Sequence, residues 1–260
     1  MRRIIASGAI ALAALGLGAV AIAAESHIPL KHQHWHFTGP FGTYDRASAQ
    51  RGFQVYKDVC AACHSLSLLA YRNLMELGLT ENQVKGIAAE VQIPDIGDDG
   101  AAIERPGRLT DRFKKPFPNE AAAAAANGGK APPDLSLIVK AREGHQDYIY
   151  SLLTGYVPFD KLTPAQIKEF DVKKDDNFNL YFPGHKIAMP PPLADGKVEY
   201  VDGTKNTLDQ MSRDVVEFLA WASEPHLEAR NRTGIRVILF LLAMAGLMYA
   251  LKRQVWADKH

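Results

Sequence analysis

Cysteine is scarce in this sequence, and so is any large excess of basic charge. Only two cysteines occur among 260 residues, Cys60 and Cys63, so a framework of structural disulfides is excluded. The whole chain has a formal charge of +1, but residues 25–229 hold 22 lysines and arginines against 28 aspartates and glutamates, a charge of −6. This acidic body argues against nucleic acid as a partner and favours solvation or a cationic partner.

Long apolar runs are confined to the two ends of the chain. Arg2 and Arg3 precede the first run, residues 4–23, which closes with small residues. This pattern is typical of a secretory signal peptide, and we expect residues 1–24 to be cleaved. A retained anchor helix is the alternative interpretation of this segment.

The second run, residues 235–251, has no polar face and is followed by Lys252 and Arg253. Its length and apolarity predict a transmembrane anchor over 230–252, and they disfavour a buried core helix. The positive-inside rule then predicts a cytoplasmic tail, 253–260, although three arginines on the other side weaken that signal. Residues 25–229 are enough for one exported domain, which we expect in the periplasm of a bacterium with the anchor in its inner membrane.

The motif Cys60-Ala61-Ala62-Cys63-His64 has the spacing that attaches a c-type haem. Two thiols bond the vinyl groups, and the adjacent histidine binds the iron. The alternatives are a thioredoxin-like dithiol, which needs a βαβ context, and a zinc site, which needs two further ligands at characteristic spacing; neither pattern is evident. Apolar residues at helical spacing predict a helix over 45–59, capped by Asp45, that carries the thiols to the haem.

The sixth iron ligand of such a haem is usually methionine or histidine. Met75 follows His64 too closely to reach the opposite face of the ring easily, and Met211 falls on the apolar stripe of a predicted core helix. Met189 lies in a proline-rich loop, residues 181–192, that is stiff enough to hold a ligand at a fixed distance. We therefore predict Met189, with His185 as the low-potential alternative.

Several longer strings make the chain resemble the cytochrome c1 family, the haem c subunits of the cytochrome bc1 (quinol:cytochrome c oxidoreductase) complex. They lie at 41–45, 50–57, 70–72, 105–109, 132–136, 151–156 and in the Met189 loop. The resemblance implies thioether attachment at Cys60 and Cys63 and iron ligation by His64 and Met189. It also implies that Arg142 binds a haem propionate. Without the resemblance, Arg142 would be interpreted as a solvated charge on a helix.

The family's fold is mainly α, a class I cytochrome c-like core, here enlarged by insertions between His64 and Met189 and followed by one C-terminal transmembrane helix. The resemblance further implies that electrons arrive from a Rieske iron–sulfur protein and leave to a soluble cytochrome c, within a dimeric complex that contains cytochrome b. The chain departs from some relatives in lacking a second cysteine pair and in its run of alanines at 121–126. Because no bond of a substrate changes on such a chain, it is not expected to be an enzyme by itself.

Two other kinds of protein would have the same haem motif and methionine loop. One is an anchored monohaem cytochrome c that feeds a terminal oxidase. The other is a haem enzyme or sensor in which the methionine leaves the iron so that a ligand can bind. The acidic segment 90–104 predicts either a docking surface for a basic cytochrome c or an ordinary solvated loop. The histidines at 27, 32, 34 and 36 predict a polar N-terminal arm, with a metal site as the alternative.

Overall fold

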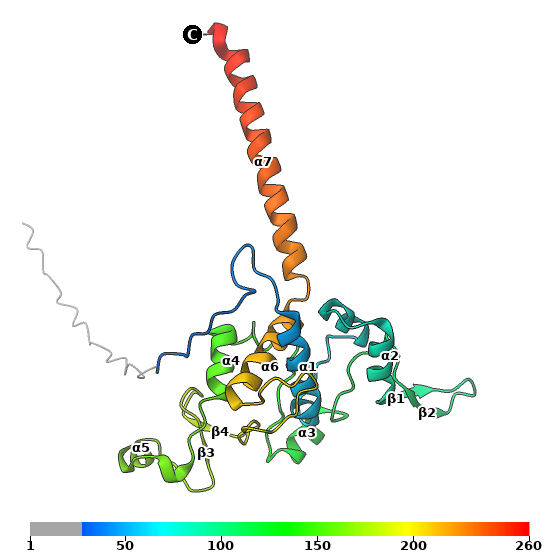
Figure 1. Ribbon diagram of the computed structural model, residues 1–260, viewed down its shortest axis with the longest axis vertical. Helices are drawn as coiled ribbons and strands as arrows, with labels where there is room; N and C mark the ends of the chain where they lie inside the picture. Colours follow the sequence, from blue (N-terminus) through cyan, green and yellow to red (C-terminus); the bar gives the residue numbers. More distant parts are fainter. Residues whose placement is uncertain (1–27, 260) are drawn as a thin grey trace, which may run out of the picture.

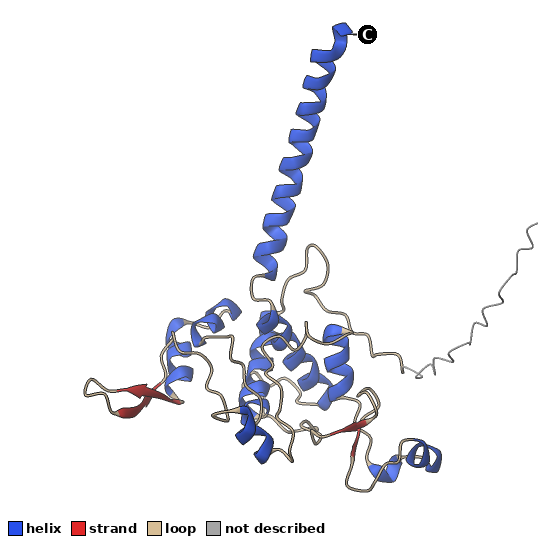
Figure 2. Cartoon of the chain, turned by 180° about the vertical axis from the view of Figure 1, so that it is seen from behind, coloured by secondary structure: helices blue, strands red, loops and turns tan. Residues whose placement is uncertain are grey.

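The computed structural model describes residues 28–259, which are mainly helical with short strands, as predicted (Figures 1 and 2). The signal-peptide prediction, residues 1–24, lies outside the described residues. The α-helices of this part are α1 (Arg46–Asp58), α2 (Glu81–Ala89), α3 (Glu120–Ala126), α4 (His145–Leu153), α5 (Pro164–Glu169), α6 (Leu208–Ser223) and α7 (Leu227–Trp256). Its 3-10 helices are η1 (Cys60–Ala62), η2 (Tyr71–Leu77), η3 (Phe159–Lys161) and η4 (Ala257–Lys259). Its strands are β1 (Gln92–Ile96), β2 (Ala102–Pro106), β3 (Asn177–Phe178) and β4 (Lys186–Ile187).

Helices α1 and α6 pack closely and form the centre of the domain, with α4 against α6 (Figure 1). At Gly52 a Cβ atom would lie 1.9 Å from the carbonyl oxygen of Asp214, so a larger residue would force the two helices apart. Next to this crossing, the rings of Phe53 and Tyr56 lie 5.6 and 5.7 Å from the ring of Phe218. The aromatic stripe predicted for the first helix is therefore buried core.

A buried ion pair joins the same two helices. Asp214 is fully buried and accepts hydrogen bonds from Arg51 Nε at 2.9 Å, Arg51 Nη2 at 3.0 Å and Ser48 Oγ at 2.6 Å. Because removing one partner of such a pair leaves a buried charge without compensation, the arrangement tolerates little sliding of α1 along α6. The end of α1 that carries the cysteines is thus fixed relative to the core.

Between His64 and Met189 the chain forms α2, α3, α4, α5 and both strand pairs. Strands β1 and β2 are antiparallel, with Gln92 opposite Pro106, and they project sideways from the helical centre (Figure 1). Much of the acidic segment 90–104 lies on this hairpin and its turn, whose side chains are mostly exposed. Strands β3 and β4 are also antiparallel; β3 precedes the Met189 loop, and β4 lies within it.

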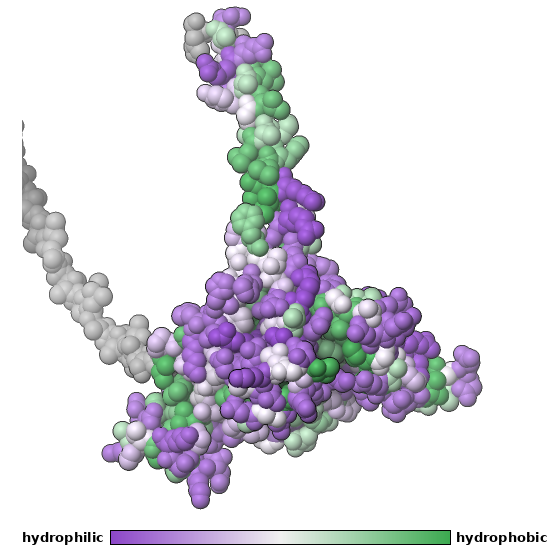
Figure 3. All heavy atoms as spheres, in the orientation of Figure 1, coloured by the Kyte–Doolittle hydropathy of each residue, from purple (hydrophilic) through white to green (hydrophobic). Residues whose placement is uncertain are grey.

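Helix α7 leaves the domain as a single rod (Figures 1 and 2). It contains 30 residues, which is about 45 Å at a rise of about 1.5 Å per residue. The apolar window within it has a mean hydropathy of 2.1 and is not buried against the rest of the chain. Figure 3 shows an apolar surface along much of the rod, with hydrophilic surface toward its ends. By length and composition α7 is able to cross a membrane.

Candidate haem-binding site

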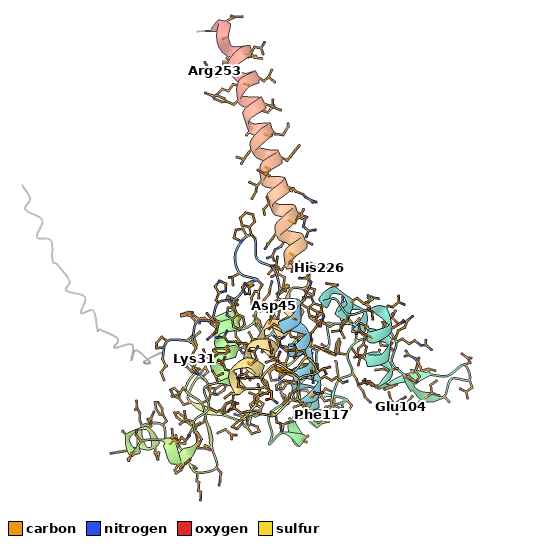
Figure 4. The ribbon with its side chains drawn as sticks, in the orientation of Figure 1. Lys31, Asp45, Glu104, Phe117, His226 and Arg253 are labelled. Carbon is orange, nitrogen blue, oxygen red and sulfur yellow. The ribbon has the colours of Figure 1, made fainter. Side chains whose placement is uncertain are left out.

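Helix α1 delivers the two cysteines. The carboxylate of Asp45 accepts hydrogen bonds from the backbone N–H groups of Ala47 at 3.0 Å and Ser48 at 3.1 Å, which confirms the predicted N-cap. Figure 4 places Asp45 near the base of α7, and α1 runs away from that base (Figure 1). The haem motif, which follows the end of α1, therefore lies on the part of the domain away from the anchor helix.

The motif itself forms a tight turn. The N–H groups of Cys63 and His64 both donate to the carbonyl of Cys60, at 3.1 and 2.9 Å, and the hydroxyl of Tyr56 donates to the carbonyl of His64 at 3.1 Å. Both cysteines are free and half-buried. This turn brings two thiols and one imidazole together, which is the donor set that c-type attachment requires.

The orientation of His64 fits that of an iron ligand. Its Nδ1 lies 2.8 Å from the carbonyl oxygen of Pro133, so Nδ1 carries the proton and Nε2 is left for a metal. Burial lowers the pKa of His64, and the bond to Pro133 opposes this only in part. A neutral, oriented imidazole is the form that coordinates iron.

The competing interpretations of the cysteine pair find no support here. Burial, with a smaller contribution from Cys63, raises the pKa of the Cys60 thiol to about 12, whereas a redox-active dithiol needs a thiol with a lowered pKa. Within residues 28–259, no three His, Cys, Asp or Glu side chains gather closely enough to hold a metal ion. The pair therefore suits covalent attachment better than redox exchange or zinc binding.

Segment 132–136 packs against the chain that follows His64. The carboxylate of Asp134 accepts hydrogen bonds from Ser65 Oγ at 2.7 Å, Ser67 N–H at 2.9 Å and Ser136 N–H at 2.8 Å. Burial alone would raise the pKa of Asp134, but the bonds from Ser136 and Ser67 hold it well below its usual range. Asp134 thus fixes the neighbouring Pro133 carbonyl against the imidazole of His64.

The sequence indicates segment 132–136 only as part of the family resemblance, and sequence reasoning missed its support of His64. The bond from His64 to Pro133 joins residues that are 69 positions apart, and no local sequence pattern predicts such a contact. The Pro-Pro-Asp sequence does indicate a fixed turn, which is the one local signal that could have drawn attention to it.

The Met189 loop is attached to the segment after α4. The hydroxyl of Tyr156 donates to the carbonyl of Met189 at 3.1 Å, and a β-bridge joins Tyr156 to Asn179. Gly155 allows this approach, because a Cβ atom there would lie 2.4 Å from the ring of Tyr181. Met189 is half-buried, and the pairing of β4 with β3 holds the backbone just before it.

His185, the alternative ligand, lies among aromatic rings. Its ring is stacked on Phe178 at 5.4 Å and lies 4.3 Å from the ring of Phe170. Its Nδ1 lies 3.1 Å from the carbonyl oxygen of Asn179, and its backbone has a positive φ of 59°. These contacts place His185 in the small apolar cluster beside α5.

The other methionines considered from sequence differ in their environment. Met211 is fully buried on α6, as predicted for a core residue, and Met75 is 39% exposed on η2. Met189 thus differs from Met211 in being partly exposed. It differs from both Met211 and Met75 in lying in a loop that is hydrogen-bonded to Tyr156.

Arg142 lies in an exposed turn before α4, and not on a helix as its sequence context suggested. Its Nη1 donates to the carbonyl of Ala141 at 3.1 Å. The residue belongs to the stretch that continues from segment 132–136 towards α4. Its assignment to a haem propionate rests on the family resemblance.

Comparison with known proteins shows the family of the chain. The model of the "Cytochrome C1 family" matches residues 35–259. Cytochrome c1 of Rhodospirillum rubrum is 47% identical over 100% of this chain and 98% of its own length. The mitochondrial haem protein cytochrome c1-2 of Solanum tuberosum is 47% identical over 93% of this chain and 91% of its own length.

A further relative is a longer protein. The "Cytochrome b/c1" of Bradyrhizobium diazoefficiens is 46% identical over 98% of this chain, which covers 40% of that relative. The family match spans the haem motif, segment 132–136, the Met189 loop and the whole of α7. The chain belongs to the cytochrome c1 family.

Proposed function

We propose that this chain is the electron-transfer subunit of a cytochrome bc1 complex, where it accepts electrons from a Rieske iron–sulfur protein and passes them to a soluble cytochrome c. Members of the cytochrome c1 family carry one covalently bound haem c. The observation that carries the proposal is the turn of Cys60, Cys63 and His64 with its imidazole directed by Pro133. A haem bound there supplies a one-electron iron couple.

The residues of the chain have holding and orienting roles in this proposal. Cys60 and Cys63 would form the thioether bonds, His64 and Met189 would bind the iron, and Arg142 would bind a propionate. Electron transfer is fast when the ligands move little between oxidation states. The Pro133 contact to His64 and the Tyr156 bond at Met189 both limit such movement.

The membrane arrangement follows from the two ends of the chain. The signal peptide 1–24 is removed, the haem domain 25–229 lies in the bacterial periplasm, and the anchor 230–252 leaves the tail 253–260 in the cytoplasm. Helix α7 supports the anchor, and Lys252 and Arg253 support the orientation. The haem motif then faces away from the membrane, where a soluble cytochrome c can reach it.

The proposed partners are cytochrome b, the Rieske protein and a soluble cytochrome c, in a dimeric complex. The relative named "Cytochrome b/c1" supports cytochrome b, because its name joins the two proteins in one chain. The Rieske protein, the soluble acceptor and the dimer follow from the family's role.

Extraction of membranes in mild detergent tests this assignment. Native electrophoresis should show the covalent haem c band of this chain together with b-type haem and a Rieske cluster. Migration of haem c without either group would refute the bc1 assignment and leave an anchored cytochrome that serves a terminal oxidase. Rapid carbon monoxide binding by the reduced protein would instead favour the enzyme or sensor, because Met189 would then be displaced.

A further inference from the structure

The N-terminal arm alternates between buried and exposed side chains. Trp35 and Phe37 are each 6% exposed, whereas His34 and His36 are exposed. His36 and Phe37 lie in a turn in which the N–H of Thr38 donates to the carbonyl of Trp35. The contact between the exposed rings of His34 and His36 places both histidines on the outer face of the arm, and their aromatic neighbours anchor it to the domain.

The backbone that carries these histidines is held on both sides. On α4, Asp147 accepts hydrogen bonds from Trp35 Nε1 at 2.6 Å and from His32 Nδ1 at 2.7 Å. Beyond the pair, the N–H of Thr43 donates to the carbonyl of His36 at 3.0 Å. The arm is consequently fixed before any ligand arrives.

The two rings already have a spacing that suits chelation. The ring centroids of His34 and His36 lie 4.9 Å apart, and the rings are inclined by 76°. With nitrogen–zinc distances of about 2.0–2.1 Å and a tetrahedral angle, two imidazoles on one zinc ion have centroids about 5 Å apart. Within the described chain, no hydrogen bond engages a ring nitrogen of either histidine.

We propose that His34 and His36 form a two-histidine binding site for Zn²⁺ on the outer face of the arm. Imidazole is a preferred ligand of zinc. His32 is separate, because its Nδ1 is directed to Asp147. Since no third His, Cys, Asp or Glu in residues 28–259 completes a metal cluster, water fills the remaining positions. The site is therefore open and exchangeable, unlike a closed structural zinc site.

Isothermal titration of Zn²⁺ into the detergent-solubilised full-length holoprotein tests this site. His34→Gln and His36→Gln should each weaken the zinc affinity at least about tenfold, which is the lower end of the loss caused by removing even an outer-shell partner. His32→Gln, on the same arm, is the matched control and should change the affinity less than about threefold. All three positions are exposed, and an unchanged haem spectrum verifies that each variant is folded.

Unchanged zinc affinity in His34→Gln and His36→Gln would overturn the proposal. A loss of equal size in His32→Gln would also overturn it, because binding would then belong to the arm as a whole and not to the pair. Because the haem spectrum and the bc1 assembly are read separately, failure of the zinc site leaves the electron-transfer function untouched.

Discussion

Replacing Asp134 with alanine removes the carboxylate that holds segment 132–136 against the chain after the haem motif. The N–H groups of Ser67 and Ser136 then lose their acceptor, and so does the hydroxyl of Ser65. The neighbouring Pro133 carbonyl, which orients His64, loses its support. The change therefore tests both the stability of the site and the orientation of the iron ligand.

The expected loss of stability follows from the two orphaned backbone donors. Each buried donor without an acceptor costs about 1–3 kcal/mol. Ser136 is 1% exposed, so water cannot replace the lost bond, whereas Ser67 is half-buried and recovers part of it. We expect Asp134→Ala to lower the free energy of unfolding by about 2–3 kcal/mol. In a chain of this size, that corresponds to a fall in Tm of about 4–12 °C.

The pH dependence of this effect has a definite sign. Hydrogen bonds from Ser136 and Ser67 hold the pKa of Asp134 below its ordinary value of 3.8 in the folded protein. The contribution of Asp134 to the free energy of unfolding is therefore fully present above the pKa of the unfolded chain. It is lost as the pH falls through the pKa of the folded protein. The matched variant Asp134→Asn, which removes the charge but keeps one acceptor oxygen, should differ from the parent more at pH 7 than at pH 3.

Thermal unfolding of the holoprotein, followed by the haem absorption and by circular dichroism, measures these differences. Asp134→Ala should melt lowest, Asp134→Asn should lie between it and the parent, and the gap between Asn and parent should narrow in acid. A Tm of Asp134→Ala within about 2 °C of the parent at pH 7 would refute the reasoning.

Three further predictions concern the redox site and its partners. Met189→Leu should abolish the thioether-to-iron charge-transfer band of the oxidised protein and allow carbon monoxide to bind, with covalent haem retained; an unchanged spectrum would remove Met189 as the ligand. Arg142→Gln should lower the reduction potential on the order of tens of millivolts, since a cation near the haem disfavours the oxidised state. Redox titration measures this change, with Arg142→Lys as the control. A potential that does not fall in Arg142→Gln would contradict the prediction. Asp98→Asn with Asp99→Asn should reduce the on-rate of a basic cytochrome c and its dependence on salt. The control Asp95→Asn should have a smaller effect because Asp95 is already ion-paired, and equal on-rates in stopped flow would exclude docking at this hairpin.

Features encoded by neighbouring residues could be predicted from the sequence. The helix over 45–59 and its cap at Asp45 are confirmed within a residue of the predicted ends. The burial of Met211 is confirmed as well, because an amphipathic helix reveals its buried face in its own spacing. The spacing of Cys60, Cys63 and His64 required no tertiary information.

Features that depend on contacts between distant segments could not be predicted in the same way. The Pro133 contact of His64 and the place of Phe178 under His185 arise only when the chain is folded. Arg142 was expected on a helix, but Gly144, with a φ of +80°, caps α4 and leaves the arginine in the preceding turn. Sequence spacing thus identified the chemical groups, while their support came from segments far along the chain.

The most direct test of the electron-transfer role is a stopped-flow measurement on the detergent-solubilised complex. Quinol should reduce the haem c of this chain, and oxidised soluble cytochrome c added next should reoxidise it. If the haem c stayed oxidised while the Rieske cluster and b-type haem were reduced, the proposed place of this chain in electron transfer would be wrong.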